Sequence, residues 1–149
     1  AGNDHFFGFD DLDGSTAWSL PTKGFLWSGP VLDAQGGTLY LGDLDGNFYS
    51  ITAADGKPAA DSIKLDGGIL ATPLLLNGQV IFVSESGVVY SLEPGKAPLI
   101  LETLEGKIYT APVATADLIL VAPFQGTYML VALDANGGQV WFYPPAAAK

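Results

Sequence analysis

Residues 24–31 read GFLWSGPV, residues 67–74 read GGILATPL and residues 106–113 read GKIYTAPV. In each of the three segments a glycine is followed six positions later by a proline, and these prolines stand 43 and 39 residues apart. A period near forty with strand-like content is typical of a β-propeller. In that architecture each repeat supplies one sheet, which cannot bury both of its faces without its neighbours.

The remainder of each repeat has the composition of paired strands. Two short runs of β-branched and aromatic residues follow each segment, separated by a turn that ends in glycine. The runs are residues 38–42 and 47–51, 79–83 and 88–92, and 118–122 and 130–133. Such runs, bounded by Gly, Asp, Asn and Ser, predict strands joined in hairpins. No window shows helical periodicity with caps over ten residues, so the chain is predicted to be all β.

The strand count predicts one partial propeller domain over residues 1–149. About fourteen strand-like runs fall into groups of four, as propeller blades require. We predict a half blade at 5–22, three four-stranded antiparallel blades at 24–65, 67–103 and 106–143, and a tail at 144–149. The strands that begin near Ala71 and Thr110 are expected to run innermost.

The composition limits the classes of partner and of chemistry. The net charge is −10, with six basic residues that are all lysines, so nucleic acid and anionic membrane surfaces are poor partners. The absence of cysteine excludes disulfides, zinc–thiolate sites and thiol chemistry. No run approaches the roughly twenty apolar residues that span a bilayer, so direct membrane insertion is not expected.

The linkers between the third and fourth strands carry a family resemblance. Residues 8–18, GFDDLDGSTAW, resemble the tryptophan-docking motif of pyrroloquinoline-quinone-like propellers, in which a Trp stands four residues after a Thr-Gly pair. Residues 132–141, ALDANGGQVW, resemble the same motif one residue short. The second motif has Ala60 in place of the tryptophan, and the third, at 91–95, is two residues shorter and has none.

The resemblance implies structural roles for two tryptophans. Trp18 and Trp141 are predicted to dock one blade on the next, because a large planar ring fills the space between adjacent twisted sheets. The two junctions without tryptophan must rely on other apolar side chains. Family members usually close with seven or eight blades, so the resemblance further implies that this chain corresponds to the C-terminal half of a larger propeller.

The resemblance to BamB-like members implies a non-enzymatic scaffold for protein–protein interaction. Its expected location is extracytoplasmic, in the periplasm, at the cell surface or secreted. Two alternatives remain open. One is a fragment of a quinoprotein dehydrogenase, and the other is the sensor domain of a membrane receptor or kinase.

Four aromatic residues are candidates for partner binding. Trp27 and Tyr109, together with Leu70, occupy one repeat position just before each innermost strand, so they should lie on one face around the channel mouth. Phe25 and Phe124 are aromatic residues in loops, and loops on a rigid scaffold are where propellers bind partners. The alternative is that these rings only cap the ends of the blade core.

The sequence predicts no catalytic residue, metal site or bound cofactor. Residues 43–47, DLDGN, and 10–14, DDLDG, resemble the openings of calcium loops, but the glutamate that would complete the ligands is absent from the required position. Asp and Asn also initiate tight turns, which explains both segments. His5 is the only histidine, and no nucleophile motif accompanies it.

The expected partner is a protein. Half a propeller should expose an apolar blade face near Tyr143 and an unpaired strand edge beside residues 6–9. We therefore expect self-association or pairing with the missing half of the propeller.

Overall fold

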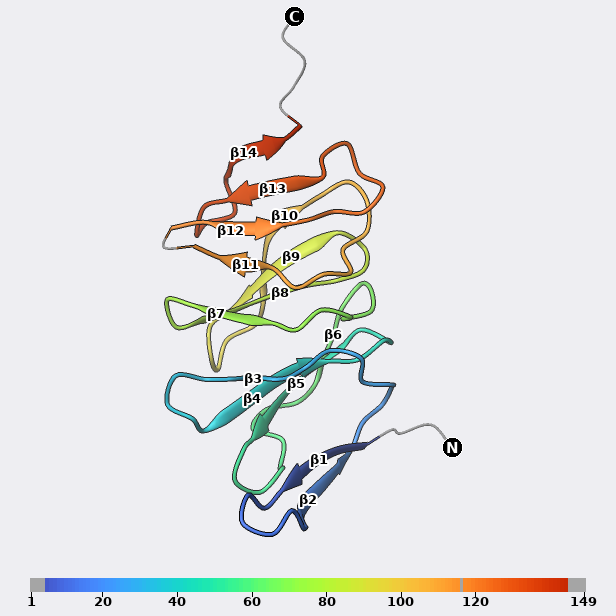
Figure 1. Ribbon diagram of the computed structural model, residues 1–149, viewed down its shortest axis with the longest axis vertical. Helices are drawn as coiled ribbons and strands as arrows, with labels where there is room; N and C mark the ends of the chain where they lie inside the picture. The colour runs from blue at the N-terminus through green and yellow to red at the C-terminus, as the bar shows by residue number, and fades with distance from the viewer. Residues whose placement is uncertain (1–4, 116, 145–149) are drawn as a thin grey trace, which may run out of the picture.

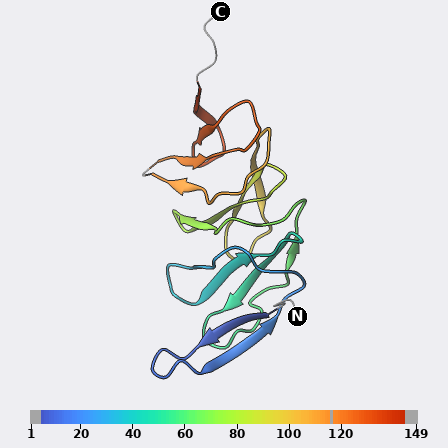
Figure 2. The same cartoon turned by 45° about the vertical axis from the view of Figure 1, so that its right-hand side comes forward.

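The computed structural model describes residues 5–115 and 117–144. These residues form one two-stranded and three four-stranded antiparallel sheets. Figures 1 and 2 show the sheets stacked face to face along the longest axis, with the first hairpin at one end and the last strand at the other. The described residues contain no helix, and therefore none that could cross a membrane. The predicted all-β architecture of about three and a half propeller blades is confirmed.

Each four-stranded sheet is a meander in chain order, and we name the sheets blades 1, 2 and 3. The half blade is β1 (His5–Phe9) and β2 (Thr16–Pro21). Blade 1 is β3 (Val31–Leu32), β4 (Thr38–Gly42), β5 (Asn47–Thr52) and β6 (Ile63–Lys64). Blade 2 is β7 (Leu74–Leu76), β8 (Gln79–Val83), β9 (Val88–Leu92) and β10 (Leu99–Thr103). Blade 3 is β11 (Val113–Ala114), β12 (Ile119–Val121), β13 (Leu130–Leu133) and β14 (Gln139–Tyr143).

The first strand of each blade is shorter than the sequence suggests. β7 and β11 begin at Leu74 and Val113, three residues after the predicted starts near Ala71 and Thr110. The motif proline stands directly before each of these strands, and proline has no N–H group to donate to a ladder. We name residues 24–30, 67–73 and 106–112 the lead-in segments; they lie outside the blade strands and contact the blades through single bridges and backbone hydrogen bonds.

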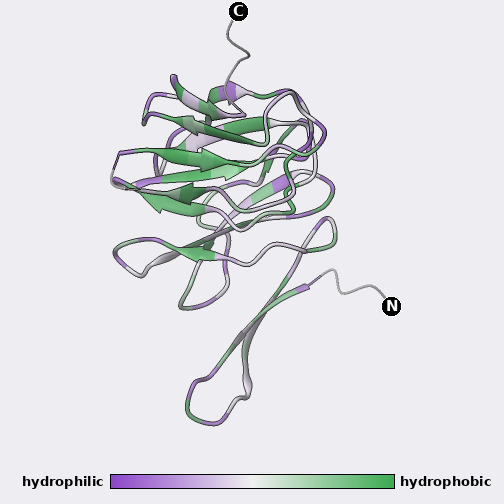
Figure 3. Cartoon of the chain, turned by 45° about the horizontal axis from the view of Figure 1, so that its top comes forward, coloured by the Kyte–Doolittle hydropathy of each residue, from purple (hydrophilic) through white to green (hydrophobic). Residues whose placement is uncertain are grey.

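Alternation along the strands gives blades 1 and 2 two buried faces each. In β8, Val80 and Phe82 belong to the cluster between blades 1 and 2, whereas Ile81 and Val83 belong to the cluster between blades 2 and 3. A strand that is buried on both sides needs apolar residues at every position, because neighbouring side chains point to opposite faces. Figure 3 shows hydrophobic residues concentrated along the stacked strands.

Candidate functional site

Each blade brings its lead-in segment beside the turn between its second and third strands. Backbone hydrogen bonds of 2.6–2.9 Å join them at equivalent positions. The joined residues are Phe25 and Leu44 in blade 1, Gly68 and Glu85 in blade 2, and Lys107 and Phe124 in blade 3. The turns after β4, β8 and β12 all lie on the right-hand side of the stack in Figure 1. One side of the propeller is therefore built from the same two chain positions in each repeat, one in the lead-in segment and one in the turn.

The blade 1 part of this side is apolar. Phe25, Leu44 and Trp27 are all exposed, and Trp27 presents 75% of its surface to solvent. Leu26, between the two aromatic residues, packs instead against the core cluster next to the half blade. Because side chains alternate along extended backbone, turning Leu26 inward turns Phe25 and Trp27 outward.

The same positions in blades 2 and 3 carry charge. Lys107 Nζ lies 2.5 Å from Glu85 Oε1, and the Tyr109 hydroxyl donates a hydrogen bond of 3.3 Å to the same oxygen. The hydrogen bond between Lys107 and Glu85 stabilises both charged forms. It lowers the pKa of Glu85 and raises the pKa of Lys107. Tyr109 also packs against Phe124, with ring centroids 5.9 Å apart. The exposed ion pair adds little stability but restricts where these two rings lie.

The four predicted partner-binding residues thus fall into two groups on one side of the molecule. Phe25 and Trp27 belong to blade 1, and Tyr109 and Phe124 belong to blade 3. No ring-to-ring contact joins the two groups among the described residues. Sequence reasoning missed Leu44 as a member of the first group. Aligning the turns after the second strand of each repeat would have found it, since it is the counterpart of Phe124.

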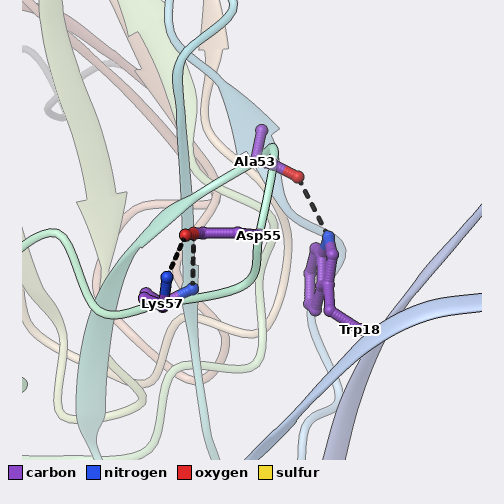
Figure 4. A network of polar contacts seen from close by, with 4 residues as sticks. All are labelled: Trp18, Ala53, Asp55 and Lys57. Atoms are coloured by element: carbon purple, nitrogen blue, oxygen red, sulfur yellow. Dashed lines mark hydrogen bonds and ion pairs between the residues drawn. The ribbon is translucent and has the colours of Figure 1, made fainter.

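Trp18 lies in the junction between the half blade and blade 1. Its Nε1 donates a hydrogen bond of 3.0 Å to the Ala53 carbonyl in the turn after β5, as Figure 4 shows. The indole packs between Gly8 of its own hairpin and Gly56 of that turn, and a Cβ atom at either glycine would overlap the ring. Phe6 packs against the indole with a centroid distance of 5.4 Å. These contacts join the half blade to blade 1, and the docking role predicted for Trp18 stays a prediction.

The junction between blades 1 and 2 is closed differently. Ala60 occupies the tryptophan position, and Gly95, the motif glycine of blade 2, faces open space where Gly56 faces an indole. Four buried aromatic rings are stacked in this junction instead, namely Tyr40, Phe48, Phe82 and Tyr90. The central pair, Phe48 of blade 1 and Phe82 of blade 2, has a centroid distance of 4.0 Å.

Blades 2 and 3 approach by a third arrangement. A Cβ atom at Gly137 would overlap the carbonyl of Leu101 in β10, so backbone lies against backbone there. Trp141, on the last strand of blade 3, is 41% exposed. Its indole has no hydrogen-bond or ring partner among residues 5–115 and 117–144. The docking role predicted for Trp141 stays a prediction.

The aspartates of the two calcium-like segments are engaged in their own turns. The fully buried Asp43 accepts hydrogen bonds of 2.7–2.8 Å from Asn47 N, Asn47 Nδ2 and the Tyr49 hydroxyl. Asp10 accepts one of 2.9 Å from Leu12 N. Burial, followed by the bond to Asp43, raises the pKa of Tyr49 well above its usual range. The described residues contain no group of three or more His, Cys, Asp or Glu side chains that could hold a metal ion.

Comparisons with known proteins agree with this architecture. A family model described as the outer membrane protein assembly factor BamB matches residues 3–144. The crystal structure of BamB from Moraxella catarrhalis is similar over 93% of this chain and 42% of its own, with a TM-score of 0.69 and 23% identity. The computationally designed Ika8 protein is similar over 91% of this chain and 42% of its own, with a TM-score of 0.73 and 16% identity.

One curated enzyme also matches part of the sequence. The lanthanide-dependent methanol dehydrogenase of Methylacidiphilum fumariolicum (strain SolV) is 33% identical over 81 residues. That alignment covers 52% of this chain and 13% of the enzyme. The chain thus spans less than half the length of the two solved structures and a small part of the dehydrogenase.

Proposed function

The chain belongs to the family of the outer membrane protein assembly factor BamB, and on this premise we propose that it is a non-enzymatic scaffold that binds other proteins. The observation that carries the proposal is the apolar group on blade 1, where Phe25, Trp27 and Leu44 are exposed at neighbouring positions. Exposed aromatic residues are enriched at protein interfaces, and a few of them supply most of the binding energy.

We define the aromatic face as Phe25, Trp27 and Leu44 of blade 1 with Tyr109 and Phe124 of blade 3. The ion pair of Glu85 and Lys107 lies between its blade 1 and blade 3 parts, so the face carries two apolar groups with a charged pair between them. The net charge of −10 favours a neutral or basic partner, because opposite charge speeds the encounter of two proteins.

Site-specific cross-linking tests this face. A photoreactive amino acid is placed at Trp27 or Tyr109, and in a matched control at Asp117, an exposed position in the turn between β11 and β12 on the opposite side. In the organism that makes the protein, both face positions should yield adducts with the same protein, and Asp117 should not. Adducts from all three positions alike, or from none, would contradict the proposal.

We place this scaffold outside the cytoplasm, because the family is defined by an outer membrane assembly factor. The name of that factor concerns outer membrane proteins, so a component or substrate of their assembly is the expected class of partner. Cell fractionation tests the location. Recovery of the protein with the soluble cytoplasmic fraction would contradict it.

The match to methanol dehydrogenase keeps a second function open. A quinoprotein-type reaction would need polar groups around a cofactor, yet His5 lies exposed on β1, stacked on Phe7 at 6.0 Å. The test is dye-linked oxidation of methanol in the presence of pyrroloquinoline quinone and a lanthanide ion. Sustained turnover would replace the scaffold proposal with an enzymatic one.

Self-association is the second part of the proposal. Phe7 and Phe9 are exposed on the half blade with their rings stacked at 6.3 Å, and Val140, Trp141 and Tyr143 are exposed on β14. A second copy, or propeller sequence outside these residues, would cover both faces. The 149-residue polypeptide alone is expected to form dimers. Light scattering that shows a stable monomer at tens of micromolar would contradict this.

A further inference from the structure

We propose that a cleft between blades 1 and 2 binds the tryptophan side chain of a partner polypeptide. This cleft, which we name the Ala60 cleft, has a volume of about 490 Å³. Ligand pockets usually measure roughly 300–1,000 Å³. The buried side chains of Tyr40 and Leu92 line it from within, and the exposed Ala60, Pro94 and Gly95 stand at its mouth.

The chain itself shows which group closes such a junction. One junction earlier, the Trp18 indole lies against Gly56, whose φ is +69°. In the Ala60 cleft the corresponding Gly95 keeps a left-handed φ of +79°, but nothing lies within 4 Å of where its Cβ would be. The glycine that would face a ring is thus retained, while the ring is replaced by the methyl group of Ala60.

The lining of the cleft suits a planar ring with a single donor. Tyr40 belongs to the stack of four aromatic rings, so an aromatic floor is already present. Ser50 and Asp61 supply oxygen atoms that an indole N–H could reach, as buried indoles usually require. Asp61 and Lys96 carry opposite charges, so the lining of the cleft favours neither an anionic nor a cationic ligand. A charged ligand group buried there without a partner would also be costly.

A polypeptide fits better than a free aromatic molecule because a second cavity adjoins the Ala60 cleft and could hold the residues next to a bound tryptophan. This second cavity, of about 340 Å³, shares Pro94 with the cleft and is lined by Asp33 and Glu93. Residues that flank a bound tryptophan would lie there, and the two acidic side chains favour a basic neighbour. β6 has only two residues, against five in β10, so the outer strand of blade 1 leaves the cleft open to solvent.

This inference rests on the proposed scaffold function but concerns a site separate from the aromatic face. Its test uses the peptide acetyl-Trp-Lys-amide, titrated into the full chain and followed by backbone amide NMR. Saturable shifts should appear at Gly95 and Ala60, and acetyl-Ala-Lys-amide should cause none. Ala60→Trp, which fills the cleft from within, should weaken binding at least about tenfold. Ala54→Trp, at an exposed alanine of the same turn but outside the cleft, should bind like the parent protein.

The Trp18→Ala variant tests the proposal independently of Ala60→Trp. Emptying the first junction should create a second site for the same peptide, raising the stoichiometry from one to two; if this variant does not fold, Ala60→Trp alone decides. No saturable binding at millimolar peptide, or unchanged binding by Ala60→Trp, would overturn the proposal. Equally tight binding of N-acetyltryptophanamide would overturn the polypeptide as the occupant in favour of a small aromatic molecule. Cross-linking at Trp27 is scored separately, so failure here is distinguishable from failure of the scaffold proposal.

Discussion

Two neighbouring junctions of one chain are filled in different ways. Between the half blade and blade 1, Leu41, Tyr49 and Ile51 form the buried interior, and one indole lies against backbone glycines and donates one hydrogen bond. Between blades 1 and 2, four stacked rings fill the interior and leave a cleft where the indole would be. The backbone repeat holds sheets at a spacing of roughly 10 Å, and different side chains can fill that space. A repeat position without the tryptophan therefore leaves space in its junction.

The largest effect is expected from the stacked rings. Phe82 is fully buried between Phe48 and Tyr90, so Phe82→Ala should destabilise the protein by about 3–5 kcal/mol. The midpoint of denaturant unfolding measures this. Phe82→Leu, which keeps most of the volume, serves as the control and should cost less. A loss below about 1 kcal/mol for Phe82→Ala would show that the stack is not what holds the second junction.

The indole of the first junction should matter less, because Trp18 is only partly buried. Trp18→Ala is expected to cost about 2–3 kcal/mol, below the roughly 3–5 kcal/mol for loss of a fully buried ring. Trp18→Phe keeps an aromatic ring but removes the hydrogen bond to Ala53, which should cost about 1 kcal/mol. If Trp18→Ala lowers the free energy of unfolding more than Phe82→Ala does, the first junction contributes more stability than the second, and the expected order is wrong.

A matched pair of glycines isolates the ring contact. Gly56→Ala and Gly95→Ala both place a Cβ on left-handed backbone, which costs about 1–2 kcal/mol in each case. Only at Gly56 does the new methyl group also overlap the Trp18 ring. Gly56→Ala should therefore be the more destabilising by at least about 1 kcal/mol. Equal losses in thermal or denaturant unfolding would mean that the indole is not held against this turn.

The smallest expected effect is a loss of folding stability at alkaline pH, to which one tyrosine in each junction contributes. Tyr49 in the first and Tyr90 in the second each donate a hydrogen bond of 2.7 Å to a carboxylate, that of Asp43 and Asp66 respectively. Burial, then these bonds, raises the pKa of both hydroxyls above the unfolded value. A raised folded pKa means that stability is complete below about pH 10 and falls as the pH rises further.

Unfolding midpoints measured from pH 8 to 11 test this expectation. Tyr49→Phe and Tyr90→Phe should each reduce the alkaline decline, because neither has a hydroxyl to ionise. At neutral pH Tyr49→Phe should cost the more of the two, since it leaves the fully buried Asp43 with fewer donors. If stability declines identically in the parent protein, Tyr49→Phe and Tyr90→Phe, the alkaline decline comes from groups other than these two tyrosines.

The sequence by itself determined the architecture. The prolines at a period near forty and the hairpin runs that follow them specify a four-stranded unit, because strand pairing within a blade is local in the chain. Continuous apolar runs such as residues 80–83 specify burial on both faces, and hence stacking of one sheet on another. The exposure of Trp27 could also be anticipated, because it alternates with the inward-facing Leu26.

Only the tertiary structure decided how the blades meet. That Phe48 reaches Phe82, that Glu85 of blade 2 pairs with Lys107 before blade 3, and that Ala60 leaves a cleft all depend on side chains from different repeats. The period specifies that two blades are adjacent, but not the offset and rotation between them. These are set by the packing of the side chains in the junction, which no single repeat contains.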